Sequence, residues 1–210
     1  MKEVTLSRFL EDLSAGTPVP GGGSVSALAA ALSASLICMV ANLTVGKKGF
    51  EDVRGEMERI LKEALSIKDR SLEIMAKDVE AFRRVLEAYR LPKETPSQRE
   101  QRSRRIEEAY KEAIEPPLEV IEDALRLLSL CETLVERGNP SAISDAAVAL
   151  YLAEAALKGG VSNVIINLKN LKDEGLRGSI RERIEGLQER AKALKERVEA
   201  VLSSKLFHTP

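Results

Sequence analysis

The sequence predicts an all-α protein: a multi-helix bundle in which long antiparallel helices surround a central helix rich in Ala and Ser. Two observations predict this class. Apolar residues recur three or four positions apart over most of the 210 residues. Period-2 alternation and the Asn-Gly or Asp-Gly turns of hairpins are absent from the sequence. The length suits a single helical domain over residues 1–210.

The first half of the chain divides at glycines and prolines. A short amphipathic helix is expected over 5–13, and a loop rich in Gly and Pro follows it. The central helix is expected over 24–45, closed by Gly46. A long helix then spans about 51–90, and Pro92 ends it.

The second half is divided by proline and glycine pairs. Pro116-Pro117 predicts a kink or break in a long helix. In the Gly-Asn-Pro turn that follows, Asn139 is the expected N-cap of a new helix, which ends at Gly159-Gly160. The helices expected here span 97–136, 141–158, 161–172 and 176–203.

Composition excludes several function classes. The formal net charge is −1, from 32 basic and 33 acidic residues, and aromatic residues are 3% of the chain, which argues against nucleic acid as a partner. The single histidine, His208, stands next to the C-terminus, so a His-based triad or a His-rich metal site is not expected. Cys38 and Cys131 have no CxxC partner and indicate small buried thiols in a reducing, cytoplasmic setting.

Residues 13–46 contain no charged side chain. The segment is therefore a candidate for a membrane span or for a buried core helix. It is dominated by Ala and Ser rather than by Leu, Ile and Phe, which is a weak membrane-insertion signal. We interpret it as the central helix of the bundle, with no membrane as a partner.

The most informative motif is Pro20-Gly21-Gly22-Gly23-Ser24. Three glycines are an entropically costly way to make a plain loop, but they permit close backbone approach. They also leave free N–H groups at the start of the helix, which suit an anionic or carbonyl group of a substrate. The alternative is a helix N-terminus with a flexible lead-in.

Asp78 and Asp145 are the candidate catalytic carboxylates. Asp78 lies at helical spacing among apolar residues, and desolvation there raises a carboxyl pKa toward the range useful for proton transfer. The alternative is an Asp that caps a helix or pairs with an Arg of a neighbouring helix. Asp145 lies in a small, apolar segment near a helix N-terminus, where a role in stabilising the helix dipole is the alternative to a functional one.

Amides and lysines complete the candidate binding residues. Asn163 and Asn167 are four residues apart among apolar neighbours, and buried amides need partners on another helix or on a ligand. Lys47 and Lys48 follow the central helix, where they stabilise its C-terminus or bind a carboxylate tail. No metal-ligand spacing is present in the sequence.

These segments, in this order, resemble the cyclodeaminase family, which comprises formiminotetrahydrofolate cyclodeaminase and methenyltetrahydrofolate cyclohydrolase. The residues that carry the resemblance are Pro20-Gly21-Gly22-Gly23-Ser24-Val25, Gly46-Lys47-Lys48, Asp78 with Ala81-Phe82, Leu91-Pro92-Lys93, Pro117-Leu118, Gly138-Asn139, Ser144-Asp145, Asn163-Val164-Ile165-Ile166-Asn167-Leu168 and Asp173.

The resemblance implies a cytosolic, homodimeric enzyme of one-carbon metabolism and histidine catabolism, without the formiminotransferase domain of animal members. It implies cyclisation of 5-formiminotetrahydrofolate to 5,10-methenyltetrahydrofolate with release of ammonia, and no cofactor beyond the tetrahydrofolate substrate. Asp78 is then the proton shuttle, and Asp145 orients it or stabilises the cationic amidine. Asn163, Asn167 and the N–H groups of residues 22–24 face the pterin, and the lysine pair binds the glutamate tail.

Two other functions stay open at this point. The cyclohydrolase reaction opens the same methenyl bridge with water and suits the same site. A non-catalytic helical scaffold would have no folate affinity, but it gives no reason for the glycine triplet or the pair of amides.

Overall fold

The computed structural model describes residues 4–207, so His208 lies outside the described part. All regular structure within it is helical, which confirms the predicted class. The elements are α1 (Leu6–Ser14), α2 (Gly22–Val45), the short 3-10 helix η1 (Glu51–Val53), α3 (Arg54–Arg90), α4 (Pro96–Arg137), the 3-10 helix η2 (Pro140–Ala142), α5 (Ile143–Leu168) and α6 (Glu174–Phe207).

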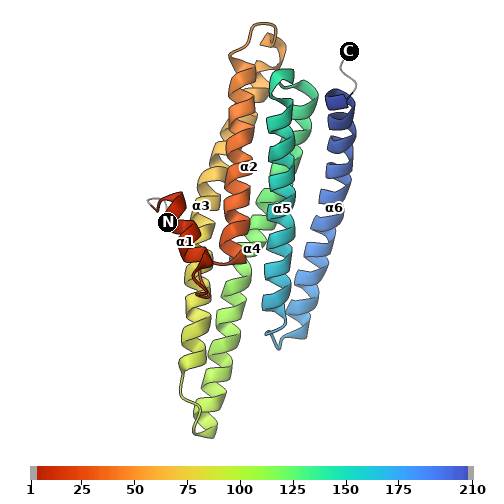
Figure 1. Ribbon diagram of the computed structural model, residues 1–210. Helices are drawn as coiled ribbons and strands as arrows, with labels where there is room; N and C mark the ends of the chain where they lie inside the picture. Colours follow the sequence, from red (N-terminus) through yellow and green to blue (C-terminus); the bar gives the residue numbers. More distant parts are fainter. Residues whose placement is uncertain (1–3, 208–210) are drawn as a thin grey trace.

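Helices α2 to α5 form an antiparallel four-helix bundle (Figure 1). Each packs against its neighbour in sequence, α5 also packs against α2, and α6 lies on α4 and α5. Small side chains let α2 approach closely, and the Ser33 hydroxyl donates to the Ala149 carbonyl of α5 at 2.7 Å. Larger apolar side chains fill the centre; those with almost no exposure include Ile37, Met57, Ile67, Ile74, Ile121, Leu127 and Leu150.

Local capping explains where several helices begin. Thr95 and Gln98 form a capping box at the start of α4, with Pro96 as the first helical residue. The Asn139 side chain accepts from the Ser141 N–H at 3.1 Å, so it caps the turn that leads into α5. Gly46 closes α2 as expected.

Two expected interruptions are wrong. Helix α4 runs through Pro116 and Pro117 without a break, and α5 runs through Gly159 and Gly160 to Leu168. At Gly160 a side chain would collide with Ile121 and approach the Pro117 carbonyl, and at Gly159 it would collide with Ser26. These glycines therefore sit inside a helix because α4 and α2 approach it too closely for any side chain.

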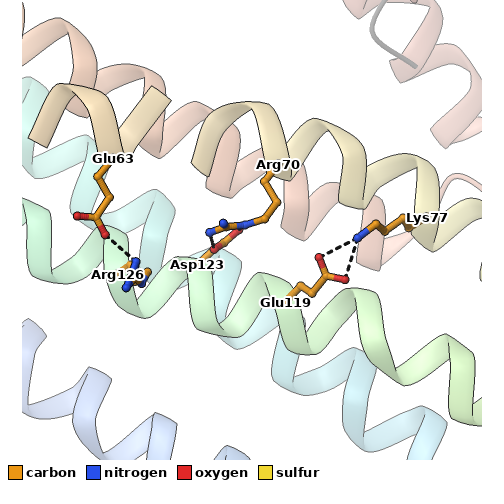
Figure 2. A network of polar contacts seen from close by, with 6 residues as sticks. All are labelled: Glu63, Arg70, Lys77, Glu119, Asp123 and Arg126. Atoms are coloured by element: carbon orange, nitrogen blue, oxygen red, sulfur yellow. Dashed lines mark hydrogen bonds and ion pairs between the residues drawn. The ribbon is translucent and has the colours of Figure 1, made fainter. Parts of the chain in front are cut away.

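A row of ion pairs joins α3 to α4 (Figure 2). Asp123 is buried, with 3% of its surface exposed, and accepts two hydrogen bonds from the Arg70 guanidinium, one of them from Nε at 2.8 Å. Burial raises the pKa of Asp123, and Arg70 opposes that shift. The exposed pairs on either side join Glu63 to Arg126 and Lys77 to Glu119.

The uncharged segment forms a helix of the bundle. By length and composition alone, Gly22–Val45 and Pro140–Leu168 could each cross a membrane. The most apolar window of the first is 61% buried inside the bundle and that of the second is 44% buried. Both are packed against neighbouring helices, as core helices of a bundle are.

Candidate functional site

The first turn of α2 forms the floor of a small pocket, and close approach requires a glycine there at position 23. At Gly23 a side chain would collide with the carboxylate of Asp78. At Gly22 it would lie 3.4 Å from the Asn163 amide nitrogen, which is an ordinary contact. Gly23 therefore lets the Asp78 side chain of α3 lie directly on the backbone of α2, and the flexible lead-in is not needed to explain it.

Asp78 is held against this helix start by Ser24. The Ser24 hydroxyl donates to Oδ2 of Asp78 at 2.8 Å. Burial raises the pKa of Asp78 above its ordinary value, while hydrogen bonds from the side chain and backbone of Ser24 oppose the shift. No lysine or arginine of the described chain pairs with Asp78, so its carboxyl group is desolvated without a compensating cation.

The two asparagines line the same pocket from α5. Asn163 donates from Nδ2 to the Gly159 carbonyl at 2.8 Å, and Asn167 donates to the Ala113 carbonyl of α4, also at 2.8 Å. In both side chains the amide nitrogen is thus engaged by the protein. Within the described residues neither amide oxygen receives a hydrogen bond, so each remains an acceptor for a ligand.

The lining comes from four segments of the chain. Residues that the sequence analysis did not assign to the site also line the pocket: Pro18, Val19, Phe82, Ala113 and Ile166. Spacing could have found two of them, since Phe82 follows Asp78 by one helical turn and Ile166 lies between the two asparagines. Pro20 is not among the lining residues; its peptide bond with Val19 is cis.

The lysine pair lies at the opposite end of α2. A 24-residue helix separates it from the glycines, which is about 36 Å at 1.5 Å per residue. The Lys47 ammonium donates to Oδ1 of Asn139 at 2.9 Å and lies over the Phe50 ring. Within one chain the lysines therefore do not contribute to the pocket at Gly22.

Asp145 also lies far from Asp78. It is in the first turn of α5, half-buried, near the Asn139 turn and the lysine pair. It precedes Asn163 by 18 residues of one continuous helix, or about 27 Å. The expectation that Asp145 orients Asp78 is wrong for residues of the same chain, because a straight helix holds them apart.

Metal ligands do not gather in the described residues. Within 4–207 no group of three or more His, Cys, Asp or Glu side chains is placed to hold an ion. The site is thus an acidic, glycine-floored pocket in an all-helical bundle, with one desolvated carboxyl group and two amide acceptors.

These features describe an all-helical protein with a pocket built around one desolvated carboxyl group. Comparison with known proteins identifies its family. A family model described as formiminotransferase-cyclodeaminase matches residues 5–186. The methenyltetrahydrofolate cyclohydrolase of Methylorubrum extorquens is 37% identical over 202 residues, which are 96% of this chain and 97% of that protein. The formimidoyltransferase-cyclodeaminase of Rattus norvegicus is 33% identical over 190 residues, which are 90% of this chain and 35% of that longer protein.

A solved structure agrees with these matches. The crystal structure of formiminotetrahydrofolate cyclodeaminase from Thermotoga maritima superposes with a TM-score of 0.88 at 32% identity, covering 98% of this chain and 99% of that one. The chain belongs to the formiminotransferase-cyclodeaminase family of enzymes. The resemblance drawn from the motifs is confirmed, and the scaffold alternative is set aside.

Proposed function

We propose that the protein cyclises 5-formiminotetrahydrofolate to 5,10-methenyltetrahydrofolate and releases ammonia. The observation that carries the proposal is the carboxyl group of Asp78, desolvated at the glycine floor and held by Ser24. The relatives named as cyclodeaminases, in the rat and in Thermotoga, support the reaction.

The chemistry needs one group that can both accept and donate a proton. The formimino group on N5 enters protonated, as an amidinium, and N10 of the folate attacks its carbon. N10 then gives up its proton. The tetrahedral carbon expels its exocyclic nitrogen as ammonia once that nitrogen is protonated. Asp78 accepts the first proton and returns it to the leaving nitrogen, a role that contributes typically about 10² to 10⁴ in rate.

The remaining pocket residues suit the pterin ring. The amide oxygens of Asn163 and Asn167 accept from the donor groups of its aminopyrimidinone edge. The start of α2, from Gly21 to Gly23, presents N–H groups that have no acceptor inside the helix. The reaction forms one C–N bond, breaks another and moves a proton without a change of oxidation state, so we propose no cofactor other than the folate itself.

We also propose a cytoplasmic homodimer. The thiols of Cys38 and Cys131 are both buried and unpaired, which suits a reducing compartment. Apolar side chains exposed along α2 and α5 support self-association.

Methenyltetrahydrofolate cyclohydrolase is the second candidate function. The Methylorubrum relative, which is named for that activity, matches nearly the whole chain at 37% identity. Water would then attack the same bridging carbon, with Asp78 as the base.

A coupled assay separates the two reactions. The protein is given 5-formiminotetrahydrofolate, and methenyltetrahydrofolate absorbance and ammonia are followed together. Equal amounts of both products support the cyclodeaminase, and hydrolysis of methenyltetrahydrofolate alone supports the cyclohydrolase. The matched controls are Asp78→Asn, expected to be inactive, and Asp69→Asn on the exposed face of the same helix, expected to be active. Methenyltetrahydrofolate is offered separately as the second substrate. If the folded protein turns over neither substrate, the proposal is wrong.

A further inference from the structure

A hollow at one end of the bundle gathers four cationic side chains. In Figure 1 the hairpin of α3 and α4 projects past the loop that joins α5 to α6. Where the hairpin and this loop meet, they line a hollow of about 270 Å³. Among its described lining residues the cations are Lys93, Arg99, Arg102 and Lys172, here called the basic cluster, and the one carboxylate is Glu107. The hollow therefore carries a net positive charge.

Neutral groups fix the two arginines of the basic cluster. Arg99 donates to the carbonyls of Lys93 and Glu94 at 3.3 and 3.0 Å, in the turn between α3 and α4. Arg102 donates to the Tyr89 carbonyl at 3.0 Å, and its guanidinium lies over the Tyr89 ring. Both guanidinium groups are thus held in position by carbonyls and a ring, without a carboxylate to neutralise them.

The charge of the basic cluster is not neutralised by the chain. The Lys172 ammonium donates to the Ser103 hydroxyl at 2.6 Å, and Glu107 accepts from the backbone N–H of Lys172 at 3.3 Å. Within residues 4–207 none of the four cations forms an ion pair with a carboxylate. Elsewhere on α3 and α4 exposed cations do pair, as Arg84 does with Glu112. Four unpaired cations around one hollow indicate a site for an anion.

The hollow follows the pocket of Asp78 along the seam between α4 and α5. On α4, Ile106 lines the hollow and Ala113 lines the pocket, seven residues further along the same face, which is about 10 Å. On the other side of the seam, Ile166 lines the pocket, and Asn170, which donates to the Ile166 carbonyl at 3.2 Å, lines the hollow. One ligand of sufficient length can therefore occupy both cavities.

The separation of the two cavities matches the proposed substrate. In a tetrahydrofolate an aminobenzoyl group links N10 to the glutamate tail, and this group is about 7 Å long at bond lengths of about 1.4 Å. With N10 at Asp78, a tail directed along the seam brings its first carboxylates to the basic cluster. The pocket itself has no lysine or arginine among its described lining residues, so it offers those carboxylates no cation.

We infer that the basic cluster binds the carboxylates of the substrate's γ-linked glutamate tail, and that it makes the enzyme favour tails with several glutamates. Guanidinium and ammonium groups suit this ligand, because both form charge-assisted hydrogen bonds with carboxylates. The identity of the tail rests on the proposed folate substrate, whereas the charge of the hollow does not.

Kinetics with tails of different length test the inference. We expect the KM for 5-formiminotetrahydrofolate with five glutamates to be about 10-fold lower than the KM with one. Lys93→Gln/Lys172→Gln removes two charges of the cluster and leaves both arginines in place. We expect it to raise the KM for five glutamates about 5 to 20-fold, since each exposed ionic contact contributes a few-fold. The KM for one glutamate should rise much less, and kcat should stay unchanged.

Lys62→Gln/Lys192→Gln is the matched control. Both lysines are exposed, on α3 and α6, and they lie outside both cavities. The control removes the same charge, so a general effect of net charge would appear in it as well. We expect wild-type KM values with both tails. A wild-type enzyme without a preference for the longer tail, or a cluster variant that keeps this preference, would overturn the inference.

Binding of a tail without the pterin tests the subsite apart from turnover. The probe is aminobenzoyl-penta-γ-glutamate, titrated calorimetrically into the wild type and both double variants. We expect the cluster variant to bind it at least about 5-fold more weakly than the other two proteins. Wild-type binding should weaken as the salt concentration rises, because salt screens exposed charges. Equal affinity of the three proteins would overturn the inference.

Two further outcomes are distinguished by the same titration. If the folded protein is inactive on both folates, the proposed function fails, and the titration still decides whether the cluster binds the tail. Penta-α-glutamate, which represents an acidic segment of another protein, lacks the aminobenzoyl group and should bind at least about 5-fold more weakly than the probe. Binding as tight as that of the γ-linked probe would overturn the assignment of the cluster to the tail.

Discussion

Asn167 on α5 donates its side-chain amide, at 2.8 Å, to the carbonyl of Ala113 on α4. In an α-helix that carbonyl would accept from the N–H four residues later, and here this residue is Pro117, which has none. The asparagine thus replaces the hydrogen bond that the proline removes. A residue assigned to the ligand from its sequence pattern also holds the bundle together at the pocket.

Replacing the asparagine should be costly only while the proline is present. We expect Asn167→Ala to lower the free energy of unfolding by about 1–3 kcal/mol, because it leaves a partly buried carbonyl unsatisfied. In a Pro117→Ala background the backbone N–H at position 117 satisfies that carbonyl, so the loss should be smaller. Urea denaturation of the four proteins gives the coupling.

A control for this cycle lies one turn further along. Asn170 donates to the Ile166 carbonyl on an exposed surface, and Asn170→Ala should change the free energy of unfolding by less than about 0.5 kcal/mol. An equal loss from Asn167→Ala in both backgrounds would contradict the substitution of one hydrogen bond for the other.

Removing the charge of Asp78 should separate activity from stability. We expect Asp78→Asn to lower kcat about 10² to 10⁴-fold, because the amide cannot carry the proton. The same change should leave the free energy of unfolding unchanged or higher, because burial penalises the ionised form of this carboxyl group. Steady-state kinetics and thermal denaturation of the same preparation check both parts.

The raised pKa of Asp78 also sets a pH dependence with opposite signs for rate and stability. The base form is lost as the pH falls through the folded pKa, which lies above 3.8, so kcat/KM should fall there. Between 3.8 and the folded pKa the native state binds more protons than the unfolded state, and stability therefore decreases as the pH rises through this window. Asp78→Asn should abolish that contribution; a stability profile identical to wild type would count against it.

A methyl group at the pocket floor should be damaging. Gly23→Ala places a Cβ against the Asp78 carboxylate, so we expect loss of both stability and activity as the carboxylate is displaced. Gly186→Ala is the matched change on the exposed face of α6, where a Cβ meets nothing within 4 Å. It should stabilise the protein by about 0.5–1 kcal/mol through helix propensity. Similar effects of the two substitutions would contradict the close approach.

The buried ion pair of Figure 2 should depend on both partners. Arg70→Met leaves the carboxylate of Asp123 buried without its cation, at an expected cost of about 3–5 kcal/mol. Arg126→Gln, at the exposed neighbouring pair, should cost about 1 kcal/mol or less. Combining Arg70→Met with Asp123→Leu should recover most of the lost free energy of unfolding, because neither charge is then left without its partner. Failure to recover it would mean that the ion pair itself stabilises the fold more than apolar side chains do in its place.

The helix ends were predictable from the sequence because they are set locally. Thr95 with Gln98, Asn139 before Pro140, and Gly46 each act within a few residues of the chain. The continuity of α4 through its two prolines and of α5 through its two glycines was not predictable, because contacts between helices decide it. From another helix, Asn167 supplies the hydrogen bond that Pro117 cannot donate. A glycine stands inside α5 at position 160 because Ile121 leaves no room there for a side chain.

The candidate site divides in the same way. Asp78, the glycine triplet and the two asparagines come together, as their motif types indicated. Lys47 and Asp145 do not join them, since α2 and α5 hold their two ends some tens of ångströms apart. Short motifs single out candidate residues, but they do not show which of these residues share one pocket.

One wall of the pocket is main chain. At Gly23 the Asp78 carboxylate occupies the space that a Cβ would need, so mutation cannot reshape this wall there without displacing Asp78. A search for altered substrate preference has to work on the rest of the lining, at Val19, Phe82 and Ile166. In a mutational library Gly23 should therefore tolerate almost no replacement, whereas those three positions provide the accessible variation.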